Sequence, residues 1–161
     1  MHNLFLVLVF LFGLPLSAAA QNVDFAFPSD VLGFRFGDSR EAALQNCLSG
    51  ENYDINVYIC HRSRTSIGFD ADTYLVFNTD GYVERIWIQS NPADSLSESR
   101  EFYTILLNDL IDRFGQADHV TNETVYCWSF DELHEEGEIN IGFYMIENGH
   151  GFFQINFNAN P

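Results

Sequence analysis

Residues 73–89 read TYLVFNTDGYVERIWIQ. Two runs rich in aromatic and β-branched residues flank Asn78-Thr79-Asp80-Gly81, and an Asp-Gly pair between such runs is a strong signal for a hairpin turn. The pattern predicts two antiparallel strands, Thr73–Phe77 and Tyr82–Gln89. Strict alternation would put Val83, Arg85 and Trp87 on one face of the second strand, and Tyr82, Glu84, Ile86 and Ile88 on the other.

A helix and another strand are predicted before this hairpin. Asp38 and Glu41 have the spacing of a capping box, apolar residues follow at helical spacing, and Gly50 closes the segment. A strand follows over Ile55–His61. Asp70-Ala71-Asp72 is then expected to be a turn that leads into the hairpin.

The second half of the chain repeats that order. Ser95 and Glu98 form another capping box, before an amphipathic helix that ends at Gly115. Asp109 and Arg113 lie one turn apart on this helix and are expected to form an ion pair. The strands that follow are predicted at Val125–Phe130, Glu138–Ile146 and Gly151–Asn158, the last two joined around Asn148-Gly149.

The repeated order predicts a tandem duplication within a single domain. The first unit covers about residues 31–90 and the second about 95–158, with Ser90–Ser97 as the linker and Gln21–Ser29 as a flexible or edge-pairing lead. We expect an α+β fold of two helix-strand-hairpin units, with antiparallel sheet packed against two helices.

The first twenty residues have the pattern of an export signal. They contain no Lys, Arg, Asp or Glu, run apolar from Leu4 to Leu16, and end in small residues before Gln21. As a helix the apolar run is about 20 Å long, shorter than the ~30 Å hydrocarbon core of a bilayer. We therefore expect cleavage near Ala20, no stable membrane anchor, and a periplasmic or secreted domain over 21–161.

The chain is strongly acidic. Its formal net charge is −16, and its seven Lys and Arg residues are all arginines. Such a charge repels the phosphates of nucleic acids and anionic lipids, so neither is an expected partner. The charge serves either solubility or the binding of a cationic partner.

Three short segments carry a resemblance to known proteins. They are GFRFGDSREA at 33–42, RFGQA at 113–117 and the aromatic strand that contains Trp128. Together they resemble small bacterial envelope proteins, namely the outer-membrane assembly lipoproteins and the secreted β-lactamase-inhibitory proteins. The resemblance implies helix-plus-sheet units that act by binding other proteins. It assigns a role to no individual residue.

Three cysteines in an exported chain predict one disulfide and one remaining thiol. Cys47 on the first predicted helix and Cys60 in the strand beneath it are the preferred pair. Cys60 with Cys127, which hold matching places in the two halves, is the alternative. In the preferred pairing Cys127 remains as a buried thiol beside Trp128.

Two chemical alternatives stay open at the sequence level. In the first, Cys127 is the nucleophile of a thiol hydrolase, with His134 or His150 as its base and Asp131 or Asn148 to orient that base.

In the second alternative, the acidic segment 131–138 binds a divalent cation, although it lacks the ligand spacing of calcium loops and zinc sites. Because no complete catalytic or metal-binding motif is present, the sequence favours neither an enzyme nor a cofactor.

The sheet surface supplies the remaining functional signal. One face of each predicted hairpin mixes aromatic and polar residues, a composition found at protein-binding sites and also on ordinary solvent-exposed faces. The sequence therefore favours a non-enzymatic binding domain, an inhibitor or accessory factor for an unidentified protein of the envelope or the exterior. The candidate binding residues are Tyr82, Arg85, Trp87, Phe152 and Gln154.

Overall fold

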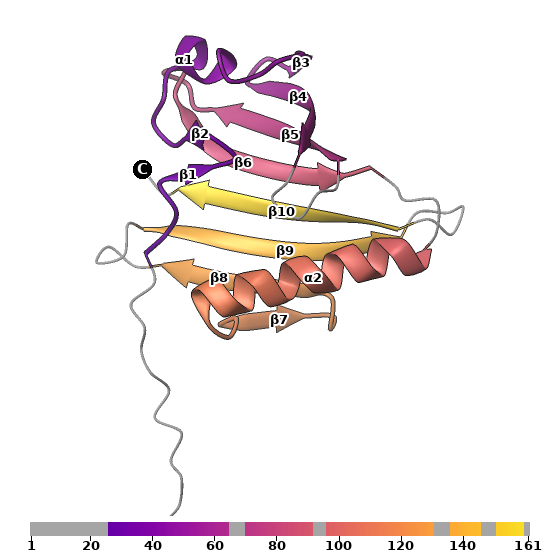
Figure 1. The fold of residues 1–161 in the computed structure, drawn as a ribbon. Coiled ribbons are helices and arrows are strands. Elements are labelled where there is room, and N and C mark those ends of the chain that lie inside the picture. Colours follow the sequence, from indigo (N-terminus) through magenta and orange to yellow (C-terminus); the bar gives the residue numbers. More distant parts are fainter. Residues whose placement is uncertain (1–25, 65–69, 92–95, 131–135, 146–150, 160–161) are drawn as a thin grey trace, which may run out of the picture.

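The computed structural model describes residues 26–64, 70–91, 96–130, 136–145 and 151–159. This part of the chain is built around one antiparallel sheet of eight strands, which lie in the order β3-β4-β5-β6-β10-β9-β8-β7 (Figure 1). A separate ribbon pairs β1 (Asp30–Val31) with β2 (Phe34–Arg35). The strands of the sheet are β3 (Gly50–Asp54), β4 (Val57–Arg64), β5 (Asp70–Phe77), β6 (Val83–Ser90), β7 (His119–Thr121), β8 (Val125–Phe130), β9 (Gly137–Met145) and β10 (Gly151–Ala159).

The expectation of an α+β fold, with two helix-strand-hairpin units whose sheet packs against two helices, is wrong. Strands hold 52% of the described residues and helices 22%. Helix α1 (Arg40–Leu44) has 5 residues, whereas α2 (Leu96–Phe114) has 19. The architecture is mostly β, with a single long helix packed on a large sheet.

The first helix is shorter than its apolar pattern predicts because the chain after Leu44 turns toward the sheet. Three successive backbone hydrogen bonds there each join residues that are three positions apart in the chain. The last of them runs from the Cys47 amide to the Leu44 carbonyl at 3.1 Å. Gly50 then begins strand β3 instead of closing a helix. The N-cap is Ser39 rather than Asp38, since the Ser39 hydroxyl accepts a hydrogen bond from the Ala42 amide at 3.3 Å.

The second helix ends where the sequence predicts. Gly115 has a φ of 76°, and its amide donates to the Ile111 carbonyl at 2.8 Å. The ion pair between Asp109 and Arg113 is confirmed at 3.0 Å. The predicted cap at Ser95 lies outside the described residues.

The order of elements divides into two similar halves. Helix α1 is followed by β3 to β6 and α2 by β7 to β10, and the halves meet where β6 pairs with β10. Each half has four strands rather than three, because sequence reasoning missed the outer strands β3 and β7. Every residue of those two strands is exposed, so they lack the alternation that reveals a half-buried strand. A common origin of the two halves stays a prediction.

Most strand boundaries agree with the predicted ones to within a few residues, and β8 coincides. The exception is Asp70-Ala71-Asp72, which belongs to β5 and is not a turn. Ala71 is fully buried and pairs with Ser90, so tertiary packing extends the strand through a segment rich in turn-forming residues. The predicted turn at Asn148-Gly149 lies outside the described residues.

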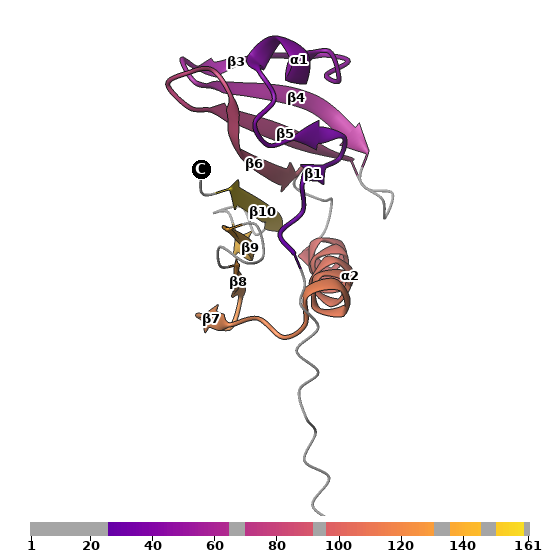
Figure 2. The ribbon, with the colours of Figure 1, turned by 90° about the vertical axis from the view of Figure 1, so that its left-hand side faces the viewer.

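One face of the sheet forms the hydrophobic core. Figures 1 and 2 show both helices and the β1–β2 ribbon on this side, and we call it the covered face (Figure 2). Burial of a side chain as large as those in this core stabilises the fold by about 1.5–3 kcal/mol. Its most deeply buried large residues are Leu75, Phe77, Ile86, Ile139, Ile141 and Phe153, and α2 adds Leu106 and Leu110.

The end of the predicted lead segment also packs on the core. Phe27 is 4% exposed, and its ring centroid lies 5.6 Å from that of Phe130. A Cβ atom on Gly137 would overlap the Phe27 ring, which explains why glycine begins β9 at this point. The expectation that residues 21–29 only lead into the fold is therefore wrong for Phe27.

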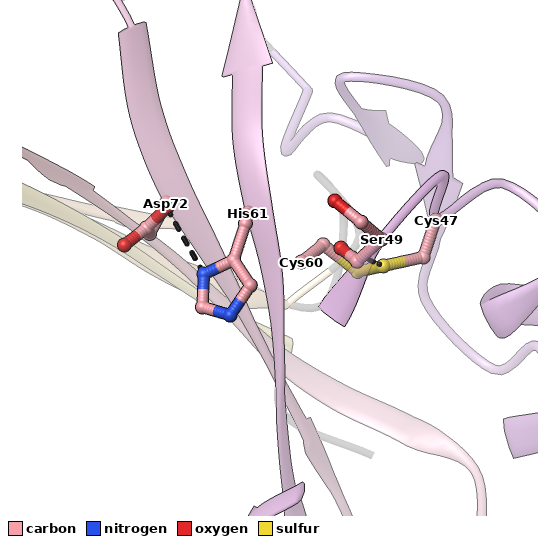
Figure 3. The surroundings of a disulfide bond; sticks show 5 residues. All are labelled: Cys47, Ser49, Cys60, His61 and Asp72. Carbon is pink, nitrogen blue, oxygen red and sulfur yellow. Dashed lines mark hydrogen bonds and ion pairs between the residues drawn. A yellow bond between two sulfur atoms is a disulfide. The ribbon is translucent and has the colours of Figure 1, made fainter. Parts of the chain in front are cut away.

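The preferred disulfide, Cys47–Cys60, is confirmed. Cys60 lies opposite Thr73 on the covered face, and the bond fastens the turn after α1 to β4. The Cys47 sulfur lies 3.2 Å from the Ser49 carbonyl oxygen (Figure 3). His61, the next residue on β4, points to the opposite side of the strand, toward Asp72.

Candidate protein-binding face

The second side of the sheet carries neither of the described helices, and we call it the uncovered face (Figure 2). Strand pairing aligns a row of residues across five strands at its centre. Tyr74 lies opposite Trp87, Trp87 opposite Asn156, Asn156 opposite Asn140, and Asn140 opposite Cys127. Side chains directly opposite on neighbouring strands are in contact range, so this row is a continuous strip of surface.

One end of the row is aromatic. The ring centroids of Tyr74 and Trp87 are 4.7 Å apart, and those of Tyr53 and Tyr74 are 5.9 Å apart. We call Tyr53, Tyr74 and Trp87 the aromatic group. Ile59 lies opposite Tyr74 and is only 6% exposed, although no described helix covers it. The side chains of this face therefore pack against one another and form an ordered surface.

The other end of the row is a chain of hydrogen-bonded amides. The Gln154 amide nitrogen donates to the Asn156 Oδ1 atom at 3.1 Å, and the Asn156 amide nitrogen donates to Asn140 Oδ1 at 2.8 Å. The Asn140 amide nitrogen in turn donates to Glu138 Oε1 at 3.2 Å. Because every link points toward the Glu138 carboxylate, the network fixes the orientation of all three amides.

Near this network lie buried polar atoms that make no hydrogen bond to the described residues. Two side-chain atoms of the uncovered face, Trp87 Nε1 and Asn158 Oδ1, are buried and have no hydrogen-bond partner within the described part of the chain. Unsatisfied buried polar groups are uncommon in folded proteins. Because both atoms are buried, they can bond to water or to a ligand only after neighbouring side chains move.

Charged groups lie around the aromatic group. His61 is placed between two carboxylates, with Nδ1 3.5 Å from Asp72 and Nε2 3.8 Å from Glu51. Arg85 is exposed and lies opposite Val76 on this face. Glu138 is in the next row beyond the amides, opposite Asn158.

The structure brings four of the five predicted binding residues onto the uncovered face. Arg85 and Trp87 come from β6, and Phe152 and Gln154 come from β10. Phe152 stacks on Tyr144, with ring centroids 5.3 Å apart.

Tyr82 does not join them. It lies before the start of β6, is 48% exposed and bridges to Ser39. A register shift between Val76 and Phe77 places Val83 opposite Phe77 on the covered face, although alternation had placed it beside Arg85. A β-bulge at this point of β6 changes the side to which residues point, and no residue in the sequence marks it.

Sequence reasoning missed Tyr53, Tyr74, Asn140 and Glu138 as members of the surface. Alternation along residues 73–77 does place Tyr74 opposite the buried positions, so a signal for this residue existed. The neighbours of Glu138 and Asn140 depend on the pairing of β9 with β8 and β10, which the sequence does not specify.

The free thiol of Cys127 is also on the uncovered face. It donates to Glu138 Oε1 with a sulfur–oxygen distance of 3.3 Å. Burial, together with this bond and the Glu138 charge, raises the pKa of Cys127 to about 11. The thiol is therefore protonated at neutral pH, unlike the thiolate that a nucleophilic cysteine needs. The alternative pairing of Cys60 with Cys127 is wrong, and Cys127 faces away from the buried Trp128.

The other groups of the predicted hydrolase, His134, His150, Asp131 and Asn148, lie outside the described residues, as does most of the acidic segment 131–138. Within the described ranges, no three His, Cys, Asp or Glu side chains converge to form a metal site.

No helix in the described part of the chain is long and apolar enough to cross a membrane. Comparison with known proteins gives no further assignment, since no protein-family model, characterised protein or solved structure matches this chain.

Proposed function

We propose that this protein is a non-enzymatic binding domain of the periplasm or the cell exterior, an inhibitor or accessory factor that holds another protein on its uncovered face. One observation carries the proposal. The chain completes its hydrophobic core on the covered face and yet places a packed group of three aromatic side chains on the other face.

The composition of the face supports this function. Binding energy at protein interfaces is concentrated in a few residues, among which Trp, Tyr and Arg are enriched. Trp87, Tyr74 and Arg85 are of these types and lie on two neighbouring strands. Because the rings of Trp87 and Tyr74 already pack together, little side-chain entropy remains to be lost when a partner binds.

The size of the face is also suitable. Five neighbouring strands of about eight residues span roughly 24 Å by 26 Å. A specific protein interface buries about 800 Å² on each partner. With a projected area of roughly 620 Å², these five strands supply about three quarters of such an interface, and the neighbouring strands β3, β4 and β7 extend the face further.

Two features support export. The apolar leader at residues 1–20 has the pattern of a cleaved signal, and the Cys47–Cys60 disulfide is compatible with an oxidising, extracellular location. A partner is therefore expected among exported or envelope proteins.

Site-specific photo-cross-linking tests the proposal. A benzophenone amino acid is placed at position 74 on the uncovered face or, as the matched control, at position 105, where Ile105 is 43% exposed on α2. Each variant is irradiated with the exported protein fraction of the producing cell. We expect a discrete adduct from position 74 and none from position 105. The same adducts from both positions, or no adduct from position 74, would refute the proposed function.

A further inference from the structure

We infer that the partner presents a cationic surface, an apolar side chain surrounded by Lys and Arg. This inference rests on the proposed function, because it names the chemistry of the partner that the uncovered face holds. It follows from where carboxylates lie relative to the aromatic group.

Carboxylates lie on both sides of the central row. Asp72 is opposite Gln89, in the row next to that of Tyr74 and Trp87. Glu138 is opposite Asn158, in the neighbouring row on the other side. Glu51, on edge strand β3, adds a carboxylate whose side chain is 71% exposed.

Among the described side chains, few positive charges lie near these carboxylates. Among the described side chains of the uncovered face, Arg85 is the one guanidinium, and His61 already lies between Glu51 and Asp72. The whole chain has 23 acidic residues against seven arginines. Its net charge of −16 therefore strengthens the negative potential of the face instead of cancelling it.

An apolar centre with polar groups around it is the usual anatomy of a protein interface. Here the charges on the described side chains around the centre are mostly negative, so electrostatic complementarity selects a positive ring on the partner. A second copy of this chain would carry the same −16 charge and is disfavoured. Complementary charge also accelerates association, and salt weakens that effect.

Defined peptides provide the test. The full mature chain is titrated with KKKWKKK, SSSWSSS and EEEWEEE, and binding is followed by amide NMR at low salt. We expect KKKWKKK to bind most tightly, with shifts concentrated on β5, β6, β9 and β10. Equal affinity for all three peptides, or KKKWKKK shifts spread evenly over the surface, would overturn the inference.

Matched charge variants separate the uncovered face from the overall charge. The face variant is Glu51→Gln, Asp72→Asn and Glu138→Gln, and the control is Glu98→Gln, Glu101→Gln and Asp112→Asn, which removes three exposed charges from α2. We expect the face variant to bind KKKWKKK roughly tenfold more weakly, the product of three ion pairs worth about two- to threefold each. The control should change the affinity by less than about threefold. Equal losses of affinity for KKKWKKK in the two variants would show that binding depends only on the net charge of the chain, which would overturn the inference.

The two proposals fail in different ways. An adduct from position 74 that contains a partner with an acidic contact surface would overturn the cationic-partner inference and leave the binding function in place. The lack of any adduct from position 74 would overturn the binding function itself.

Discussion

Tyr74 and Trp87 lie directly opposite each other on neighbouring strands, with ring centroids 4.7 Å apart and ring planes inclined by 41°. Both project from the uncovered face, while Leu75 and Ile86, next to them in the chain, are fully buried on the covered face. The residues of the core and those of the proposed binding surface thus alternate along the same two strands. Substitutions on the two faces should therefore have separable effects.

The disulfide should contribute measurably to stability. Cys47 and Cys60 are 13 residues apart, and closing a loop of this length is worth about 3 kcal/mol in the chain-entropy model. We expect the Cys47→Ala, Cys60→Ala variant to unfold at a clearly lower urea concentration than the oxidised protein. Cys127→Ser is the control for loss of a thiol. An unchanged midpoint in the double variant would show that the crosslink does not stabilise the fold.

Cys127 should be slow to react in the folded protein. Burial and the bond to Glu138 raise the pKa of Cys127 to about 11, so little thiolate is present at pH 7. We expect negligible alkylation by iodoacetamide in the native state and rapid alkylation in urea. Fast native alkylation would favour the thiol hydrolase that the sequence leaves open.

The same thiol should make stability depend on alkaline pH. The pKa of Cys127 is about 11 in the folded protein against 9.0 for an exposed thiol, so the unfolded chain loses this proton first as the pH rises. The unfolded state then binds fewer protons than the folded state, and the free energy of unfolding falls between about pH 9 and 11. The loss between pH 8 and 10.5 should be smaller in Cys127→Ser, as measured by urea unfolding. An equal loss in both proteins would refute this assignment.

Tyr103 anchors α2 to the second half of the sheet. Its hydroxyl donates to the Thr124 carbonyl at 2.8 Å, and burial raises the pKa of Tyr103 to about 12. We expect Tyr103→Phe to lower the free energy of unfolding by about 1 kcal/mol, because the Thr124 carbonyl loses a partner. Urea unfolding measures this change. A variant as stable as the wild type would show that water replaces the hydroxyl without cost.

Sequence reasoning predicted the local elements better than their assembly. The Asp-Gly hairpin, the Gly115 helix end and the Cys47–Cys60 pair could be predicted because each depends on residues close together in the chain. The exposed strands β3 and β7 carry no apolar alternation, so the sheet was expected to be smaller than it is.

The candidate site shows the same limit. The alternation of Phe152 and Gln154 with buried neighbours was predictable from the sequence. The contact of Trp87 with Tyr74, and the row that continues through Asn156 and Asn140, required the register of four strands. The side of Val83 was not predictable because nothing in the local sequence marks the irregular pairing of β6 at that point, and Tyr82 lies before β6, where it bridges to Ser39.

The most direct test of the account is the affinity of the cross-linked partner, once purified, for wild-type protein and for Trp87→Ala. We expect the dissociation constant to rise about 30-fold or more, as for a central interface residue worth at least ~2 kcal/mol. Tyr103→Phe, altered on the covered face, should bind as the wild type does. Tyr74→Ala provides a second variant of the uncovered face if Trp87→Ala is poorly folded. An unchanged affinity in a folded Trp87→Ala protein, measured by isothermal titration calorimetry, would contradict the claim that the uncovered face is the binding surface.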